Sequence, residues 1–280
     1  MHGVHTALIT PFSKGELDTD TYRALARRQL YGGVQGLVPC GTTGETPTLT
    51  EPEWATCIRI AVQEADGKAF VTAGVGTNDT ASSVDNARKA KALGADAGLL
   101  VLPYYNKPNP AGHHAHVRAV ASTGLPLVLY HVPGRTGQRV SVDLLASLCN
   151  LDGVIACKEA TGDVGFGSDL VERTGVDVLS GDDFTYMPLI CVGGKGVISV
   201  VSNLAPAMSS ELAQAALEGD MPRARELHHR LMPLVHWLFS DSNPVPAKAA
   251  MAAMGLCTDE VRLPLAAGTA PPPELIEGLR

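Results

Sequence analysis

Eight short apolar runs rich in β-forming residues recur along the chain, and segments with helical character separate them. The runs begin near Val4, Val34, Phe70, Ala97, Leu127, Val154, Val176 and Val197. Runs such as AGLLVLP and LPLVLY are almost continuously apolar. That pattern is typical of strands buried on both faces of a parallel sheet. Eight such strands alternating with helices predict an α/β fold, a (β/α)₈ TIM barrel.

The segments between the runs carry signals for helix starts. They predict helices over residues 19–31, 51–65, 80–93, 111–122 and 142–148. The run Asp18-Thr19-Asp20 is expected to cap the first of these helices, Thr50 the second and Ser141 the fifth. A doubly wound sheet is the alternative architecture, but no GxGxxG or GxxxxGK[ST] motif follows an early strand.

About 80 residues follow the start of the eighth strand, and they predict three more helices over residues 206–218, 221–239 and 244–254. A Pro-rich stretch at residues 271–273 is expected to start a short terminal helix. We therefore expect residues 1–205 to form the barrel core. Residues 206–280 are expected to add the last barrel helix plus C-terminal helices, as an appendage rather than a separate domain.

Charge and cysteine content exclude several classes of protein. The chain has 22 Lys and Arg against 29 Asp and Glu, a net charge of −7, so we expect no binding to nucleic acid or to an anionic membrane. No apolar run approaches the roughly 20 residues of a spanning helix, and the N-terminus does not resemble a secretory signal. The six cysteines are scattered, which favours small core residues in a reducing cytoplasm over a zinc site or disulfides.

Lys158 is the most informative polar residue, because in a TIM barrel the active site lies at the carboxyl ends of the strands. Of eight lysines, it alone directly ends an apolar strand run, Val154 to Cys157. A neutral amine in a barrel mouth can attack a carbonyl carbon and form a Schiff base. The alternative is an ion pair at the rim with a neighbouring carboxylate such as Glu159.

The run Gly41-Thr42-Thr43-Gly44 follows the second strand and precedes a helix. Its backbone N–H groups and two hydroxyls suit a small carboxylate or phosphate. The alternative is an ordinary Gly-rich turn between a strand and a helix.

Three further residues at strand ends suggest chemistry. Tyr105 and Tyr130 could relay protons, because a phenol both donates and accepts hydrogen bonds, although tyrosines at strand ends also pack structurally. Arg135, in a Pro-Gly turn, could bind a substrate carboxylate through its guanidinium, or form a surface ion pair instead.

Metal binding is not expected. His113, His114 and His116 open a helix, and only His113 and His116 share a face, so we interpret them as a solvated helix start. The same interpretation holds for His228 and His229. The adjacent acids Asp182 and Asp183 are expected to cap the next helix.

Taken in order, the strand ends form a specific pattern. The motifs are GTTGE, PYYNKP, LYHVPGRT, CKEATGD, LSGDD, GKGVISV and NPVPAK. This pattern resembles the pyruvate-dependent class I aldolases, which include the N-acetylneuraminate lyases, and is most similar to their dihydrodipicolinate synthase family. The resemblance covers nearly the whole chain, from TALITPF to RLPL.

The resemblance implies the condensation of pyruvate with L-aspartate 4-semialdehyde to 4-hydroxy-tetrahydrodipicolinate, an early step of diaminopimelate and lysine biosynthesis. It implies no cofactor and no metal. It also implies a homotetramer built as a dimer of dimers, which the residues themselves do not predict.

The same resemblance assigns roles to residues. Lys158 would form the Schiff base with pyruvate, and Thr42, Tyr130 and Tyr105 would form a proton relay, with Tyr105 supplied by a neighbouring subunit. The remaining residues would bind substrate: Thr43 with Gly41 and Gly44 at the pyruvate carboxylate, Arg135 at the semialdehyde carboxylate, and Ile198 through its main chain.

The chain departs from the family pattern at two places. His131 stands where the family usually has Asn, which bears on pocket shape or pH response. Glu51, Trp54 and Ser82 replace residues of the lysine feedback site in sensitive members, which predicts weak or absent inhibition by lysine. Sister aldolases acting on sialic acid, 2-keto-3-deoxy sugar acids or hydroxy-oxoglutarate remain alternatives, as does a non-catalytic homologue. The Arg135 turn and NPVPAK favour the synthase.

Overall fold

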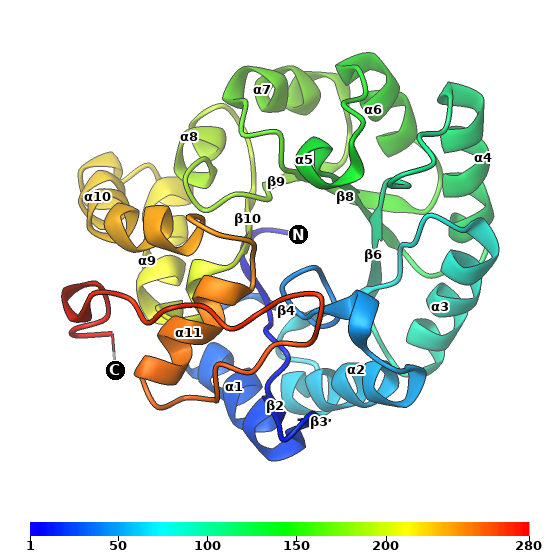
Figure 1. The fold of residues 1–280 in the computed structure, drawn as a ribbon. Coiled ribbons are helices and arrows are strands. Elements are labelled where there is room, and N and C mark those ends of the chain that lie inside the picture. Colours follow the sequence, from blue (N-terminus) through cyan, green and yellow to red (C-terminus); the bar gives the residue numbers. More distant parts are fainter. Residues whose placement is uncertain (280) are drawn as a thin grey trace.

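The computed structural model describes residues 1–279 as a closed barrel of eight parallel strands ringed by helices (Figure 1). The predicted (β/α)₈ barrel is therefore confirmed. The first and last strands pair with each other and close it. In barrel order the strands are β1 (Gly3–Ala7), β4 (Gly36–Val38), β5 (Phe70–Gly74), β6 (Ala97–Val101), β7 (Leu127–His131), β8 (Val154–Glu159), β9 (Asp177–Ser180) and β10 (Gly196–Ser199).

Helices surround the barrel close to their expected positions. They are α1 (Thr19–Tyr31), α2 (Glu51–Ala65), α3 (Thr80–Ala92), α4 (Pro110–Ala121), α6 (Val142–Cys149), α7 (Val164–Arg173), α8 (Tyr186–Cys191) and α9 (Pro206–Glu218). A capping box of Thr50 and Glu53 starts α2, and Ser141 caps α6. The cap expected from the run Asp18-Thr19-Asp20 is confirmed at Asp18, whose carboxylate accepts from the Thr21 backbone N–H.

Short elements fill the connections between strands and helices. A two-stranded hairpin of β2 (Phe12–Ser13) and β3 (Glu16–Leu17) follows β1, and its strands are too short to show an alternating pattern in the sequence. The loop after β7 contains the one-turn helix α5 (Pro133–Thr136). Single 3₁₀ turns are η1 (Thr46–Thr48), η2 (Val201–Asn203) and η3 (Pro273–Leu275).

The chain beyond the barrel forms α10 (Met221–Leu238) and α11 (Val245–Ala253) and then returns toward the N-terminal part of the chain (Figure 1). The terminal helix expected after the Pro-rich stretch is only the 3₁₀ turn η3. The division at residue 205 stays a prediction, and it falls directly before α9. None of the helices within residues 1–279 combines the length and the apolar character needed to span a membrane.

Two apolar cores lie on opposite sides of the strands. A small core fills the barrel, with Ala7, Val38, Leu99, Val128, Ala156, Leu179 and Ile198 among its buried residues. A larger core packs the outer faces of the strands against the helices. Burial on both faces explains the continuous apolar runs in the sequence. Four of the six free cysteines are buried, as expected for small core residues: Cys40, Cys57, Cys149 and Cys157.

Candidate active site

Lys158 and Tyr130 stand side by side inside the barrel. They occupy paired positions of the adjacent parallel strands β8 and β7. The Lys158 Nζ lies 4.1 Å from the centroid of the Tyr130 ring, and each residue is only 6% exposed. The pairing of β7 with β8 therefore places an amine and a phenol next to each other at the carboxyl end of the barrel, where active sites of this fold lie.

Lys158 is not the ion-pair partner of Glu159. Successive residues of a strand face opposite sides, so Glu159 points away from the barrel interior. Its Oε1 accepts a hydrogen bond of 2.7 Å from the Thr161 backbone N–H. Within residues 1–279, the lysines that form ion pairs are Lys68, Lys89 and Lys248. The Lys158 amine thus has no ion-pair partner among the described residues.

Burial behind the barrel wall raises the pKa of Glu159 from 4.5 to about 7. Folding therefore favours the protonated carboxyl, and this contribution to stability is complete below pH 4.5 and lost as the pH rises through about 7. The free energy of unfolding of the wild-type protein should therefore fall by about 3 kcal/mol as the pH rises through 7. We expect Glu159→Gln to abolish this fall. Urea unfolding at pH 5 and pH 8 tests this, and an unchanged pH dependence in the variant contradicts it.

The two acids after β9, Asp182 and Asp183, lie near Lys158 but have different surroundings. Burial raises the pKa of Asp182 to about 6, against the opposing effect of the Lys158 charge. Asp183 is fully buried, and its Oδ2 accepts 2.9 Å hydrogen bonds from the N–H groups of Val200 and Val201. The expected cap on the following helix is wrong for both acids, because α8 has Thr185 at its N-cap position and no side-chain cap hydrogen bond. Asp183 instead holds the chain that follows β10.

Gly181 packs directly against the Lys158 stem. A Cβ added there would lie 2.5 Å from the Ala160 Cβ and 3.0 Å from the Lys158 Cε. Contacts this short force neighbours to move, and a misplacement near 1 Å can cost on the order of 100-fold in rate. We expect Gly181→Ala to lower kcat by about that factor while the barrel stays folded. Steady-state kinetics with circular dichroism checks this, and wild-type kcat in a folded variant would refute it.

The turn after β4 is held in an unusual backbone conformation. Cys40 and Glu45, which bracket Gly41 to Gly44, both adopt left-handed conformations, with φ of 57° and 53°. Non-glycine residues adopt such angles only where the surroundings fix them. Gly74 on β5 allows this close approach, because a Cβ at that position would lie 1.8 Å from the Cys40 carbonyl oxygen.

Asn243 joins two of the expected carboxylate-binding residues. Its Nδ2 donates to the Thr43 hydroxyl at 2.9 Å, and its carbonyl oxygen accepts from Arg135 Nη2 at 3.3 Å. Asn243 opens the NPVPAK motif, and the sequence predicts no role for it. Its position before α11 gave no sign of contact with a turn 200 residues earlier.

The other expected binding residues have different surroundings. Gly41 has space at its Cβ position, whereas Gly44 packs against the backbone of Leu8 and Cys40. Gly44 therefore serves the packing of the turn. Ile198 is fully buried in the inner core on β10.

Tyr105 differs from the other residues, since its side chain is 88% exposed and its φ is 69°. Its backbone N–H donates to the Thr136 carbonyl oxygen at 3.3 Å, next to Arg135. The strained backbone thus presents the phenol away from the barrel of its own chain. Such an exposed aromatic side chain suits contact with a second subunit.

A cavity of about 530 Å³ opens at this end of the barrel, and Thr42, Tyr130 and Arg135 line it together with Gly41. Its lining also includes Trp54. The polar and charged residues Glu51, Ser82, Asp85, Asn86, Lys89 and Tyr104 line it as well. The volume is large enough for small carboxylated metabolites.

A model of the dihydrodipicolinate synthetase family matches residues 1–270 of the chain. The chain belongs to the dihydrodipicolinate synthetase family. The 4-hydroxy-tetrahydrodipicolinate synthase of Maridesulfovibrio salexigens is 47% identical over 267 residues, which cover 94% of this chain and 91% of that protein.

Solved structures of this family superpose closely. The dihydrodipicolinate synthase of Thermotoga maritima has a TM-score of 0.95 and 40% identity, covering 100% of this chain and 97% of its own. A structure described as a monomeric dihydrodipicolinate synthase variant has the same TM-score and identity and covers 95% of its own chain.

His131, the residue after Tyr130, is not among the residues that line the cavity. It follows Tyr130 on β7, so its ring faces the opposite side and packs 5.8 Å from the Phe166 ring centroid of α7. Burial lowers its pKa to about 4, so the ring is neutral at pH 7. The residue affects packing behind the site.

The histidines of α4 are not a solvated helix start, so that interpretation is wrong. His113 and His116 are buried, and they contact Gln138 Oε1 and the Thr80 hydroxyl at 3.2 and 2.9 Å. Within residues 1–279, no three His, Cys, Asp or Glu side chains gather in an arrangement that could hold a metal ion.

Proposed function

We propose that this chain condenses pyruvate with L-aspartate 4-semialdehyde to give 4-hydroxy-tetrahydrodipicolinate, an early step of diaminopimelate and lysine biosynthesis. The observation that carries the proposal is the buried Lys158 amine, free of any carboxylate partner within residues 1–279 and 4.1 Å from the Tyr130 ring. Family membership and the 47% identical synthase support the choice of substrates.

Lys158 begins the reaction as the nucleophile. The lone pair of its Nζ attacks C2 of pyruvate. The keto oxygen takes up protons and leaves as water, and a protonated imine then joins Nζ to C2. Thr42 and Tyr130 line the cavity and would move these protons, with Tyr105 of a second subunit completing the relay. The imine nitrogen then serves as the electron sink.

Loss of a proton from C3 of the imine gives an enamine, whose C3 attacks the aldehyde carbon of the semialdehyde. The aldehyde oxygen becomes a hydroxyl group by taking up a proton. The α-amine of the semialdehyde then attacks C2 and displaces Lys158 Nζ. This closes the ring and regenerates the free amine, so atoms and electrons balance without a further reactant.

Two anionic substrates need separate anchors. Thr43 and the backbone of its turn would bind the pyruvate carboxylate, and Arg135 would bind the carboxylate of the semialdehyde. Asn243 supports this division, because it contacts both residues and fixes their separation. Pre-positioned donors of this kind stabilise charge without reorganising during the reaction.

Trapping with borohydride tests the proposal. Incubation with pyruvate and borohydride should reduce the imine to a stable secondary amine, and intact mass followed by peptide mapping should place the adduct on Lys158. Omitting pyruvate is the control. If folded protein acquires no adduct, the assignment of Lys158 as nucleophile is wrong. An adduct with no turnover of aspartate semialdehyde would instead support a sister aldolase.

We further propose a homotetramer arranged as a dimer of dimers, in the cytoplasm. The exposed Tyr105 at the rim of the site supports at least a dimer, because the relay lacks a third hydroxyl without a second subunit. All six cysteines are free thiols, which suits a reducing compartment.

L-Lysine is expected to inhibit this enzyme weakly or not at all. Glu51, Trp54 and Ser82, the residues at which the chain departs from the lysine feedback site that the family resemblance implies, line the cavity. We expect the initial rate to fall by less than half at about 10 mM lysine, a concentration on the order of the dissociation constant of a weakly bound ligand. Initial rates measured across a lysine titration check this, with D-lysine as control. Strong inhibition at low millimolar L-lysine would contradict the expectation.

A further inference from the structure

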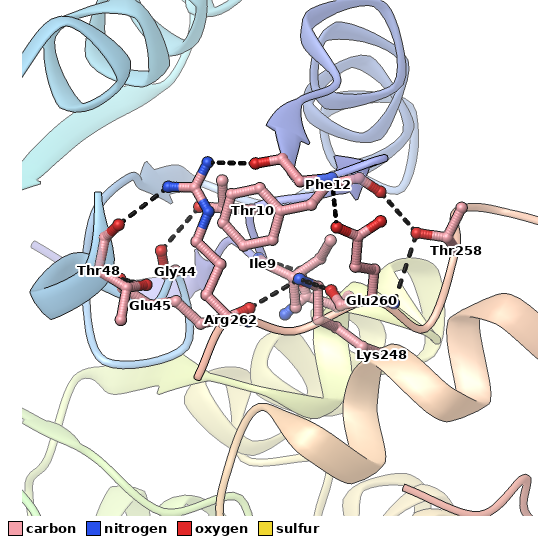
Figure 2. Close-up of polar contacts among 12 residues, drawn as sticks. Ile9, Thr10, Phe12, Gly44, Glu45, Thr48, Lys248, Thr258, Glu260 and Arg262 are labelled. Carbon is pink, nitrogen blue, oxygen red and sulfur yellow. Dashed lines mark hydrogen bonds and ion pairs between the residues drawn. The ribbon is translucent and has the colours of Figure 1, made fainter. Parts of the chain in front are cut away.

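A fully buried ion pair joins the C-terminal part of the chain to the turn at the active site. The Lys248 Nζ lies 2.7 Å from the Glu45 Oε1, and the two side chains are 0% and 1% exposed. Lys248 is on α11, and Glu45 ends the turn that carries Thr42 and Thr43 (Figure 2). The two residues are 203 positions apart in the sequence.

Both charged groups have further partners, as Figure 2 shows. Lys248 Nζ also donates to the Glu260 carbonyl oxygen and lies 4.2 Å from the Phe12 ring centroid. The second oxygen of Glu45, Oε2, accepts from the Arg262 backbone N–H at 2.9 Å. The Glu45 carboxylate is therefore held from two directions by the C-terminal segment.

The surrounding contacts extend this attachment to the whole turn. The Arg262 guanidinium donates to the Thr48 carbonyl oxygen at 2.9 Å and to the Glu53 carboxylate on α2. From the N-terminal side, the Thr10 hydroxyl donates to the Gly44 carbonyl oxygen at 2.8 Å. An N-terminal residue, Thr10, and the C-terminal segment with Lys248 and Arg262 thus both contact residues 44–48.

Stability alone does not account for such a pair. The free-energy cost of removing two charges from water is about as large as the free energy gained from their attraction. Well-packed apolar residues at such positions often give a protein of equal stability. Burial lowers the pKa of Lys248, which is a sign of that cost. The pair instead holds the side chain of Glu45 in one position. Glu45 has a left-handed backbone conformation and follows Thr43 by two residues.

We propose that Lys248 and Glu45 are positioning residues, which hold the turn so that Thr42 and Thr43 meet pyruvate in the correct geometry. This inference rests on the proposed function, since it takes Thr43 as the anchor of the pyruvate carboxylate. Neither residue touches substrate. The C-terminal segment that supplies Lys248 is therefore part of the catalytic apparatus.

Three variants test the proposal: Lys248→Met, Glu45→Gln and the double variant. Glu64→Gln is the matched control, because Glu64 pairs with Arg23 and Arg27 between α2 and α1, away from the barrel mouth. For each protein we would measure Tm, kcat, KM for pyruvate and the extent of borohydride trapping at fixed pyruvate.

The single variants each leave a buried charge unpaired, so both Tm and activity should fall. We expect kcat/KM for pyruvate to fall on the order of 100-fold, mainly through KM. The double variant removes both charges, so its Tm should recover toward that of the wild type while KM for pyruvate stays raised. The control should keep wild-type KM whatever its Tm.

Recovery of KM together with Tm in the double variant would show a purely structural role and overturn the inference. So would a wild-type KM in a folded single variant. Failure of the proposed function gives a different result, because wild-type protein would then form no pyruvate adduct or would form the adduct without turning over aspartate semialdehyde. If the single variants do not fold, the double variant alone decides between the two roles.

Discussion

Lys158→Met should form no borohydride-stable adduct with pyruvate and should lose at least about 10⁴-fold in kcat. Removal of a nucleophile typically costs this much or more, because the covalent route is closed and neighbouring groups cannot replace it. Methionine matches the lysine stem in length and can lie on the Tyr130 ring, so the barrel core should stay packed.

Three measurements make this result decisive. Intact mass after borohydride reduction reports the adduct, initial rates report turnover, and circular dichroism reports folding. Lys68→Met is the control, because Lys68 is an exposed lysine paired with Asp66 and should keep full activity and trapping at Lys158. A pyruvate adduct on the folded Lys158→Met protein would move the nucleophile to another residue.

The second large effect concerns the subunit boundary. Tyr105→Phe alone should lose on the order of 100-fold in kcat, since one member of the proton relay is missing. When Tyr105→Phe and Lys158→Met chains are co-expressed, activity should return. In a mixed dimer, the site with an intact Lys158 receives its tyrosine from the Lys158→Met chain.

Random pairing gives mixed dimers in half of all cases, and each repairs one of its two sites. The expected activity is therefore about a quarter of wild type, far above that of either variant alone. Mixing the separately purified variants without subunit exchange is the control. If co-expression gives only the mean of the two low activities, Tyr105 acts in the site of its own chain. The proposal that two subunits share each site is then wrong.

Most of the scaffold can be predicted from the sequence because it depends on local patterns. The apolar runs give the strands, and signals such as the Thr50–Glu53 capping box give helix starts that agree with the structure. Lys158 could be singled out because it ends a buried strand, where the fold concentrates catalytic groups.

What could not be predicted depends on contacts between distant segments. Asn243 and Lys248 sit in a motif that was recognised, yet their partners Thr43 and Glu45 lie about 200 residues earlier. The histidines of α4 were misjudged for a related reason. Helical spacing shows that His113 and His116 share a face, but only the packed helix shows that this face is buried.

The ion pair between Glu45 and Lys248 also has a consequence for the order of events during synthesis. Glu45 leaves the ribosome long before Lys248, and protein synthesis adds about 5 to 20 residues per second. For the roughly 10 to 40 seconds that follow from this rate, the nascent chain already carries the loop that would bind pyruvate but not the residue that fixes it. Until α11 emerges, Glu45 has no Lys248 to pair with, so the turn at residues 41–45 of the growing chain is not yet held in its final position.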